Sequence, residues 1–226
     1  MPVTRRNFLK GALALAGSGM GGALSVPALM TLLPPPVVRC NPDEAYDSLL
    51  YKRREPGAWY EPMAGKVVRK EDFKLNQAAM VTWAPKELEE ALGACYIIIT
   101  VAKVSATEEM AEWGVSDDSG DTMLMAYNSY KCTHHCCRVE WVEEGDSPLS
   151  GEDYEHQLVC PCHSNRYDPE SIVEDSGEDG RTLIGAEWLE GAGGTALPLI
   201  PLAERGGALV GRTHNLEWLN YCGLGS

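Results

Sequence analysis

The sequence predicts an all-β fold, and two of its features carry this prediction. Short runs of β-branched and apolar residues recur along the chain, and Gly and Pro residues at turn positions separate them. This pattern is typical of small antiparallel β domains. The 226 residues are enough for one such domain with a sizeable core and an N-terminal appendage, and no internal repeat is visible.

The N-terminal segment has the pattern of an export signal and membrane anchor. Residues 4–10 contain an Arg pair, an apolar pair and a Lys, an order that resembles the twin-arginine signal. Residues 11–38 then carry no charge, and about 20 apolar residues suffice to span a bilayer. We expect residues 1–33 to form a signal helix that is either cleaved near residues 26–28 or retained as a single-span anchor, and we favour retention. The basic flank would then leave the rest of the chain on the extracytoplasmic side.

The rest of the chain divides into a linker and a folded domain. Three consecutive prolines begin a stiff stretch that we assign to a linker over residues 34–60, followed by a domain over residues 61–226. Short apolar runs predict the strands of this domain, and a Pro start, an acidic first turn and a following Gly predict one short helix. Strands are predicted over residues 96–104, 123–127, 155–159 and 208–210, the helix over 85–92, a loop over 191–194 and an extended run over 196–202.

Charge and cysteine content narrow the classes of function. The formal net charge of −14 repels phosphate backbones and argues against nucleic-acid binding. We interpret the acidity as a means of solubility or as an adaptation to a salty or acidic habitat. A surface that attracts a basic partner is the less favoured interpretation. Eight cysteines predict disulfides in an oxidising compartment, metal ligands, or both.

Two segments combine cysteine and histidine at short spacing. Residues 132–137 read Cys-Thr-His-His-Cys-Cys, and residues 160–168 read Cys-Pro-Cys-His-Ser-Asn-Arg-Tyr-Asp. Each segment follows a predicted strand and brings a thiolate close to an imidazole. Two thiolates and two imidazoles are what a [2Fe–2S] cluster needs when histidines replace two cysteines on one iron. The same residue types could hold a structural zinc ion, which we keep as an alternative.

The two segments resemble the cluster-binding boxes of the Rieske iron–sulfur family, C-T-H-x-G-C and C-P-C-H-G-S-x-Y-D. The resemblance is strongest to the Rieske subunit of cytochrome bc-type quinol-oxidising complexes. It implies a [2Fe–2S] cluster that Cys132 and Cys160 bind through one iron, and His134 and His163 through the other. About fifteen residues carry the match.

The resemblance also assigns supporting roles in the two segments. It implies a disulfide between Cys137 and Cys162 that ties the cluster loops together, and a Tyr167 hydroxyl that donates to the sulfur of a ligand cysteine. For the whole domain it implies a Rieske-like antiparallel β-sandwich with a cluster-binding subdomain.

The function that the resemblance implies is electron transfer at a membrane. A Rieske protein of this kind accepts an electron and a proton from quinol and passes the electron to a cytochrome c-like acceptor, beside a cytochrome b-like subunit. It acts as the iron–sulfur subunit of an oxidoreductase and is not active alone. Alternatives are the small Rieske subunit of a molybdenum oxidase such as arsenite oxidase, and an extracytoplasmic zinc-binding interaction module without redox activity.

This chain departs from the family pattern at three places. Cys136 stands where the family has Gly, His135 stands beside the first histidine ligand, and the pair Ser164-Asn165 replaces Gly-Ser. The Ser of the family donates a hydrogen bond to a bridging sulfide and raises the potential, and an Asn amide has a different reach. We therefore expect a midpoint potential below that of members with both Ser and Tyr, and we expect Asn165→Ser to raise it. The pairing of Cys40, Cys95, Cys136 and Cys222, and the role of His135, stay open.

Overall fold

The computed structural model describes residues 46–52, 56–85, 88, 95–134, 137–176 and 182–212. The chain divides into two compact units, residues 1–38 and 39–226, and all described residues belong to the second. Strands make up most of its regular structure, with short 3-10 helices η2 (Glu61–Met63), η3 (Lys70–Asp72) and η4 (Glu108–Met110). The strands are β1 (Tyr46–Tyr51), β2 (Ala78–Ala84), β3 (Ile97–Ser105), β4 (Val115–Ser116), β5 (Thr122–Tyr127), β6 (Glu140–Asp146), β7 (Asp153–Cys160), β8 (Asn165–Ser176), β9 (Thr182–Glu190), β10 (Leu197–Pro198), β11 (Leu202–Arg205) and β12 (Ala208–Gly211).

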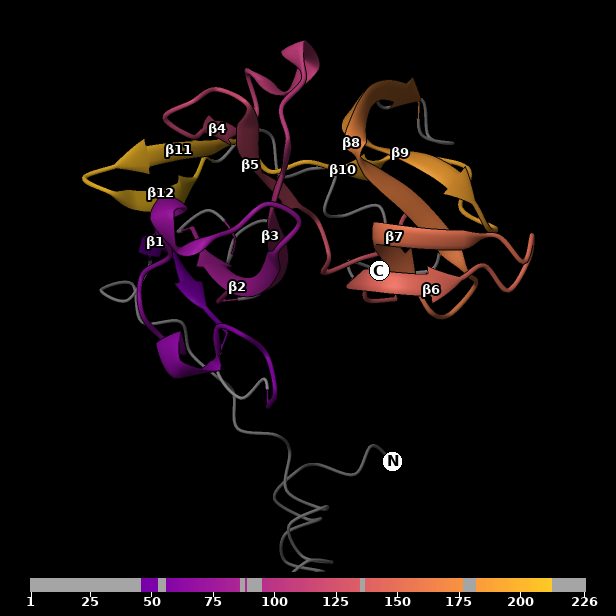
Figure 1. Ribbon diagram of the computed structural model, residues 1–226, viewed down its shortest axis with the longest axis horizontal. Coiled ribbons are helices and arrows are strands. Elements are labelled where there is room, and N and C mark those ends of the chain that lie inside the picture. Colours follow the sequence, from indigo (N-terminus) through magenta and orange to yellow (C-terminus); the bar gives the residue numbers. More distant parts are fainter. Residues whose placement is uncertain are drawn as a thin grey trace, which may run out of the picture. The chain divides into compact units, whose positions relative to one another are not determined.

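The strands form two antiparallel sheets (Figure 1). The seven-stranded sheet has the order β11-β12-β1-β2-β3-β5-β4, and the five-stranded sheet has the order β10-β9-β8-β7-β6. The chain completes most of the first sheet, builds the second from β6 to β10, and returns to the first with β11 and β12. The predicted all-β class is confirmed for the described part of the chain.

The larger sheet buries an apolar core whose pattern follows from its sequence. In β2, buried and half-buried residues alternate, as expected for a strand that packs one face against a core. In β3 six of nine residues are buried, and this strand lies inside the sheet between β2 and β5. The core of this sheet comprises Leu49, Tyr51, Tyr60, Val68, Phe73, Ala79, Val81, Trp83, Leu88, Ile97, Ile99, Val101, Leu124, Ala126, Ile200, Leu202 and Leu209.

A second core connects the end of the larger sheet to the smaller one. The Tyr127 ring is fully buried, and its hydroxyl donates to the Pro169 carbonyl oxygen over 2.7 Å. Tyr127 also forms an isolated antiparallel bridge with Leu199. The backbone N–H of Ser105 donates to the Glu170 carboxylate at 3.0 Å, so β3 and β8 are joined as well. These contacts fix the place where β5 leaves the larger sheet and enters the first cysteine segment.

Four predicted strands are confirmed with small shifts at their ends. They correspond to β3, β5, β7 and β12, and the predicted loop at residues 191–194 also lies between strands. The predicted helix over residues 85–92 lies outside the described residues except at Pro85 and Leu88.

β1 lies inside the stretch 34–60 that the sequence assigned to a linker. It pairs with β2 and with β12, so residues 46–51 belong to the folded domain. The sequence signal was weak here because the run Tyr-Asp-Ser-Leu-Leu-Tyr is short and lies between charged and Pro-containing stretches.

The predicted signal and anchor at residues 1–33 lies outside the described residues. Within the described ranges, no helix is long and apolar enough to cross a membrane.

Candidate metal centre

The first cysteine segment is a closed loop between β5 and β6. The backbone N–H of Cys132 donates to the Cys137 carbonyl oxygen at 2.6 Å. At the base of the loop, the N–H of Val139 donates to the Ser129 carbonyl oxygen at 3.0 Å. These bonds bring both ends of the loop together, so the start of the loop is held at a defined position beside β5.

The second segment is a tight connection between β7 and β8. Cys160 ends β7 and lies directly opposite Asn165, the first residue of β8. Residues 161–164 make the turn, and Ser164 adopts a left-handed backbone conformation with φ 55°. Gly is the residue best suited to that conformation, and it is Gly that the Rieske pattern has at this position. The antiparallel register therefore fixes where the cysteine and the asparagine face each other.

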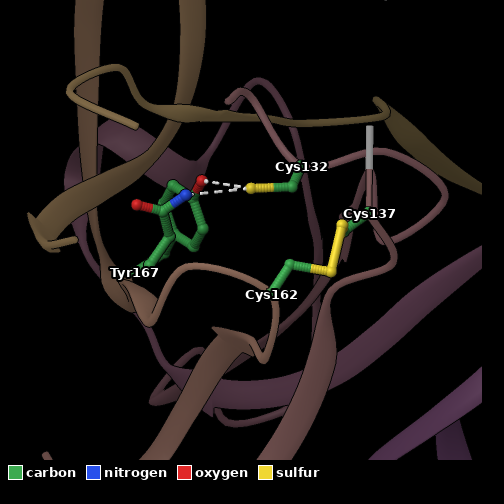
Figure 2. The surroundings of a disulfide bond; sticks show 5 residues. Cys132, Cys137, Cys162 and Tyr167 are labelled. Atoms are coloured by element: carbon green, nitrogen blue, oxygen red, sulfur yellow. Dashed lines mark hydrogen bonds between the residues drawn. A yellow bond between two sulfur atoms is a disulfide. The ribbon is translucent and has the colours of Figure 1, made fainter. Parts of the chain in front are cut away.

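The structure brings the predicted cysteine ligands Cys132 and Cys160 together from the two loops. Both are fully buried and neither is part of a disulfide. Their thiols form a hydrogen bond with each other. Cys137 and Cys162 form a disulfide, the pair that the resemblance implies, and Figure 2 shows it beside Cys132. The disulfide links the two loops covalently next to the thiol pair.

The sulfur of Cys132 accepts several hydrogen bonds. The Tyr167 hydroxyl lies 3.3 Å from it, and a dashed line in Figure 2 marks this contact. The Asn165 amide nitrogen donates to the same sulfur at 3.1 Å. The contact with the Cys160 thiol is the main cause that lowers the pKa of Cys132 to about 5, opposed by burial and assisted by Tyr167, the His134 backbone N–H and Asn165. Cys132 is thus the thiol of the pair that carries negative charge most readily.

The environment of Cys160 is different. The hydrogen bond with Cys132 and then burial raise the pKa of Cys160, although the backbone N–H groups of Cys162 and His163 oppose this rise. The contact between the two thiols therefore favours ionisation of Cys132 ahead of Cys160. A bound metal ion would require both cysteines as thiolates, because metals bind the thiolate form.

Tyr167 is the centre of a short hydrogen-bond chain. Its ring is fully buried. Its hydroxyl lies 2.8 Å from the Thr133 hydroxyl oxygen, and Thr133 in turn donates to the Thr195 carbonyl oxygen at 3.1 Å. A hydroxyl that donates to a carbonyl oxygen uses its one proton there, so Thr133 accepts from Tyr167. The Tyr167 oxygen also lies 3.3 Å from the sulfur of Cys132, and its single proton cannot be donated in full to both acceptors.

The two predicted histidine ligands lie next to each other at the surface. The rings of His134 and His163 have centroids 4.5 Å apart and are inclined at 84°. His163 is exposed and His134 is half-buried, whereas the cysteines of the same loops are fully buried. The site therefore has a thiol pair on its inner side and an imidazole pair on its outer side.

A cysteine cluster in this region could hold a metal ion. The sulfurs of Cys137, Cys160 and Cys162 lie within 4.8 Å of one another. Because the disulfide joins Cys137 to Cys162, Cys160 is the only reduced thiol of the three, and a disulfide sulfur is not a thiolate ligand. The chemically suitable donors are therefore Cys160 and its thiol neighbour Cys132, with the two histidines.

Ionic contacts anchor the base of the second loop. The Arg166 guanidinium is mostly buried, contacts the Glu190 carboxylate at 2.6 Å and donates to Gln157 at 3.0 Å. Burial raises the pKa of Glu190, but hydrogen bonds from Ser147 and Arg166 outweigh it and lower that pKa overall. The pair joins β8 to β9 one residue beyond Asn165, so it holds the start of β8 in place.

Some residues of the site were not found from the sequence. Thr133 and Gly193 have structural roles that no sequence pattern indicated, because they act through hydrogen bonds between segments distant in the chain. Among the cysteines left unassigned, Cys95 is disulfide-bonded. His135, Cys136, Cys40 and Cys222 lie outside the described residues.

The comparisons add no relative to this picture. A scan against protein-family models finds no match, and a search of curated proteins finds none either. The resemblance therefore rests on the two loops themselves.

Proposed function

We propose that this chain is an electron-transfer protein that holds a Rieske-type [2Fe–2S] cluster between the loops 132–137 and 160–168. One observation supports this most: the two loops bring together a buried, reduced cysteine pair and a surface pair of histidines. In this reading the five-stranded sheet with its loops is the cluster-binding subdomain, and the seven-stranded sheet is the base of a Rieske-like sandwich.

The donor set fits such a cluster. Cys132 and Cys160 would bind one iron, and His134 and His163 the other, as mixed ligation requires. Backbone N–H groups, an amide and a hydroxyl are directed at the two cysteine sulfurs, which suits a centre of negative charge. The cysteines are out of contact with water, so bulk solvent would not compete for the sulfurs.

The histidines would contact the substrate and accept its proton. When bound, the cluster would supply one-electron transfer. His134 and His163 lie at the accessible side of the site, where a quinol hydroxyl could donate a hydrogen bond to an imidazole. The ring nitrogen that does not bind metal would hold the proton released from the quinol. The disulfide between Cys137 and Cys162 would keep both loops at the fixed spacing that the ligands need.

The physiological setting follows from the resemblance and from the N-terminal pattern. We propose that the chain is the iron–sulfur subunit of a quinol:cytochrome c-type oxidoreductase, in contact with a cytochrome b-like subunit and a cytochrome c-like acceptor. The twin-arginine pattern at residues 4–10 supports export and a membrane anchor, with the domain on the extracytoplasmic side.

Metal and sulfide analysis of the purified chain tests the ligand set. We expect about two irons and two sulfides per chain, as a [2Fe–2S] cluster requires. Cys160→Ser and His163→Asn should lose this iron. His156→Asn is the matched control, because His156 lies in β7 outside the loops and its φ of 53° suits Asn. Stoichiometric zinc without sulfide would refute the proposal in favour of a zinc module, and so would iron that survives both ligand substitutions.

A further inference from the structure

Asn165 is a fully buried amide whose two ends are both occupied. Its nitrogen Nδ2 donates to the Cys132 sulfur at 3.1 Å, and its oxygen Oδ1 accepts the backbone N–H of Gly193 at 2.6 Å. An N–H donor can face only the oxygen of a carboxamide. The bond from Gly193 therefore fixes which end of the amide is directed at the sulfur, and that end is the NH₂ group.

The turn that holds the amide can approach it closely because it has glycine at positions 191 and 193. A Cβ atom at Gly191 would lie 2.3 Å from Asn165 Oδ1 and 2.6 Å from its Cα. A Cβ at Gly193 would lie 3.1 Å from the carboxamide carbon, nitrogen and oxygen. Gly194, by contrast, has no atom within 4 Å of such a Cβ, although its φ is 74°. The contact with Asn165 is thus specific to part of the turn.

We propose that Asn165 is a positioning residue that fixes and polarises the Cys132 sulfur, and that Gly193 holds the Asn165 amide in that orientation. This inference rests on the proposed function, since it concerns a ligand of the cluster. A donor directed at a ligand sulfur stabilises negative charge on it, and the reduced state has one more electron than the oxidised state. The amide therefore favours the reduced state and raises the midpoint potential.

Redox titration of the iron-loaded chain, monitored by EPR, tests the sign. For Asn165→Ala we expect the equilibrium constant for reduction to fall about tenfold, which corresponds to a potential lower by about 59 mV for one electron. A merely structural role for Asn165 would leave the potential unchanged in the molecules that still hold iron.

Two glycine variants test the role of the turn. Gly193→Ala crowds the carboxamide, so we expect its equilibrium constant for reduction to change at least about twofold, or about 18 mV. Gly194→Ala is the matched control: it places a side chain on the same turn, in a less favourable conformation and away from Asn165, and should keep the wild-type potential.

Each outcome separates this inference from the function on which it rests. A wild-type chain without a [2Fe–2S] cluster would refute the proposed function itself. With the cluster present, wild-type potentials in Asn165→Ala or Gly193→Ala would overturn the inference alone, as would equal shifts in Gly193→Ala and Gly194→Ala. Loss of iron from Asn165→Ala and Gly193→Ala, with iron kept in Gly194→Ala, would support it, because the contact would then be needed to hold the ligand in place.

Discussion

Removal of the disulfide between Cys137 and Cys162 should lower the free energy of unfolding by an amount that depends on the length of the loop that the bond closes. The bond joins residues 25 positions apart. Closing a loop of that length removes about 3.5 kcal/mol of conformational freedom from the unfolded chain. Neither cysteine lies fully buried, so serine at both positions leaves no large cavity. We expect the double variant Cys137→Ser/Cys162→Ser to lose most of the stabilisation of about 3.5 kcal/mol that the disulfide provides.

Thermal unfolding of the metal-free chain measures the effect without a contribution from metal binding. A loss of about 3.5 kcal/mol corresponds to a melting temperature lower by about 7 to 14 °C for a domain of this size. Reduction of the wild-type disulfide should lower the melting temperature by at least as much. A double variant that melts within about 3 °C of the wild type would contradict the reasoning, because it would mean that other contacts already hold the two loops together.

Three further predictions concern single side chains. Tyr167→Phe removes the hydroxyl 3.3 Å from the ligand sulfur, so redox titration should show a potential lower by about 59 mV, and an unchanged potential would count against a hydrogen bond there. Glu190→Gln leaves the mostly buried Arg166 without its ion pair, so denaturant unfolding should show a free energy of unfolding lower by about 3 kcal/mol. A decrease below about 0.5 kcal/mol would show that this ion pair stabilises the fold no more than an exposed salt bridge does. Asp117 has a pKa held well below its ordinary value, first by the hydrogen bond from Thr122. The ionised carboxylate therefore stabilises the folded state above about pH 4, and this stabilisation is lost as the pH falls further. Below about pH 4, the free energy of unfolding of the wild type should therefore depend more steeply on pH than that of Asp117→Asn. Parallel pH curves would refute that assignment.

The sequence predicted the fold class and the strands with strong local signals. β3 begins with a run of β-branched residues and β12 follows a pair of glycines, and both were predicted. β8 and β9 were missed, although they are long, because acidic residues interrupt their short apolar runs and most of their side chains are not fully buried. Such strands are stabilised by pairing with neighbours distant in the chain, and a single sequence does not display that pairing.

In the site, too, features carried by residue type were predicted and contacts between distant segments were not. The cysteines and histidines carry their chemistry in their residue type, so the sequence indicated Cys132, His134, Cys160 and His163 before any geometry was known. What the sequence could not indicate was the contact between Asn165 and the glycine turn, because that contact depends on backbone geometry more than 25 residues away. The burial of the cysteines and the exposure of the histidine side are also consequences of packing.

The EPR spectrum of the dithionite-reduced chain tests the central claim most directly. Mixed histidine and cysteine ligation predicts a rhombic signal with the low average g value typical of Rieske centres, from about two irons per chain. A signal with the higher average g value of an all-cysteine cluster would contradict the assignment of His134 and His163 as ligands. An EPR-silent protein with stoichiometric zinc would contradict the redox function altogether.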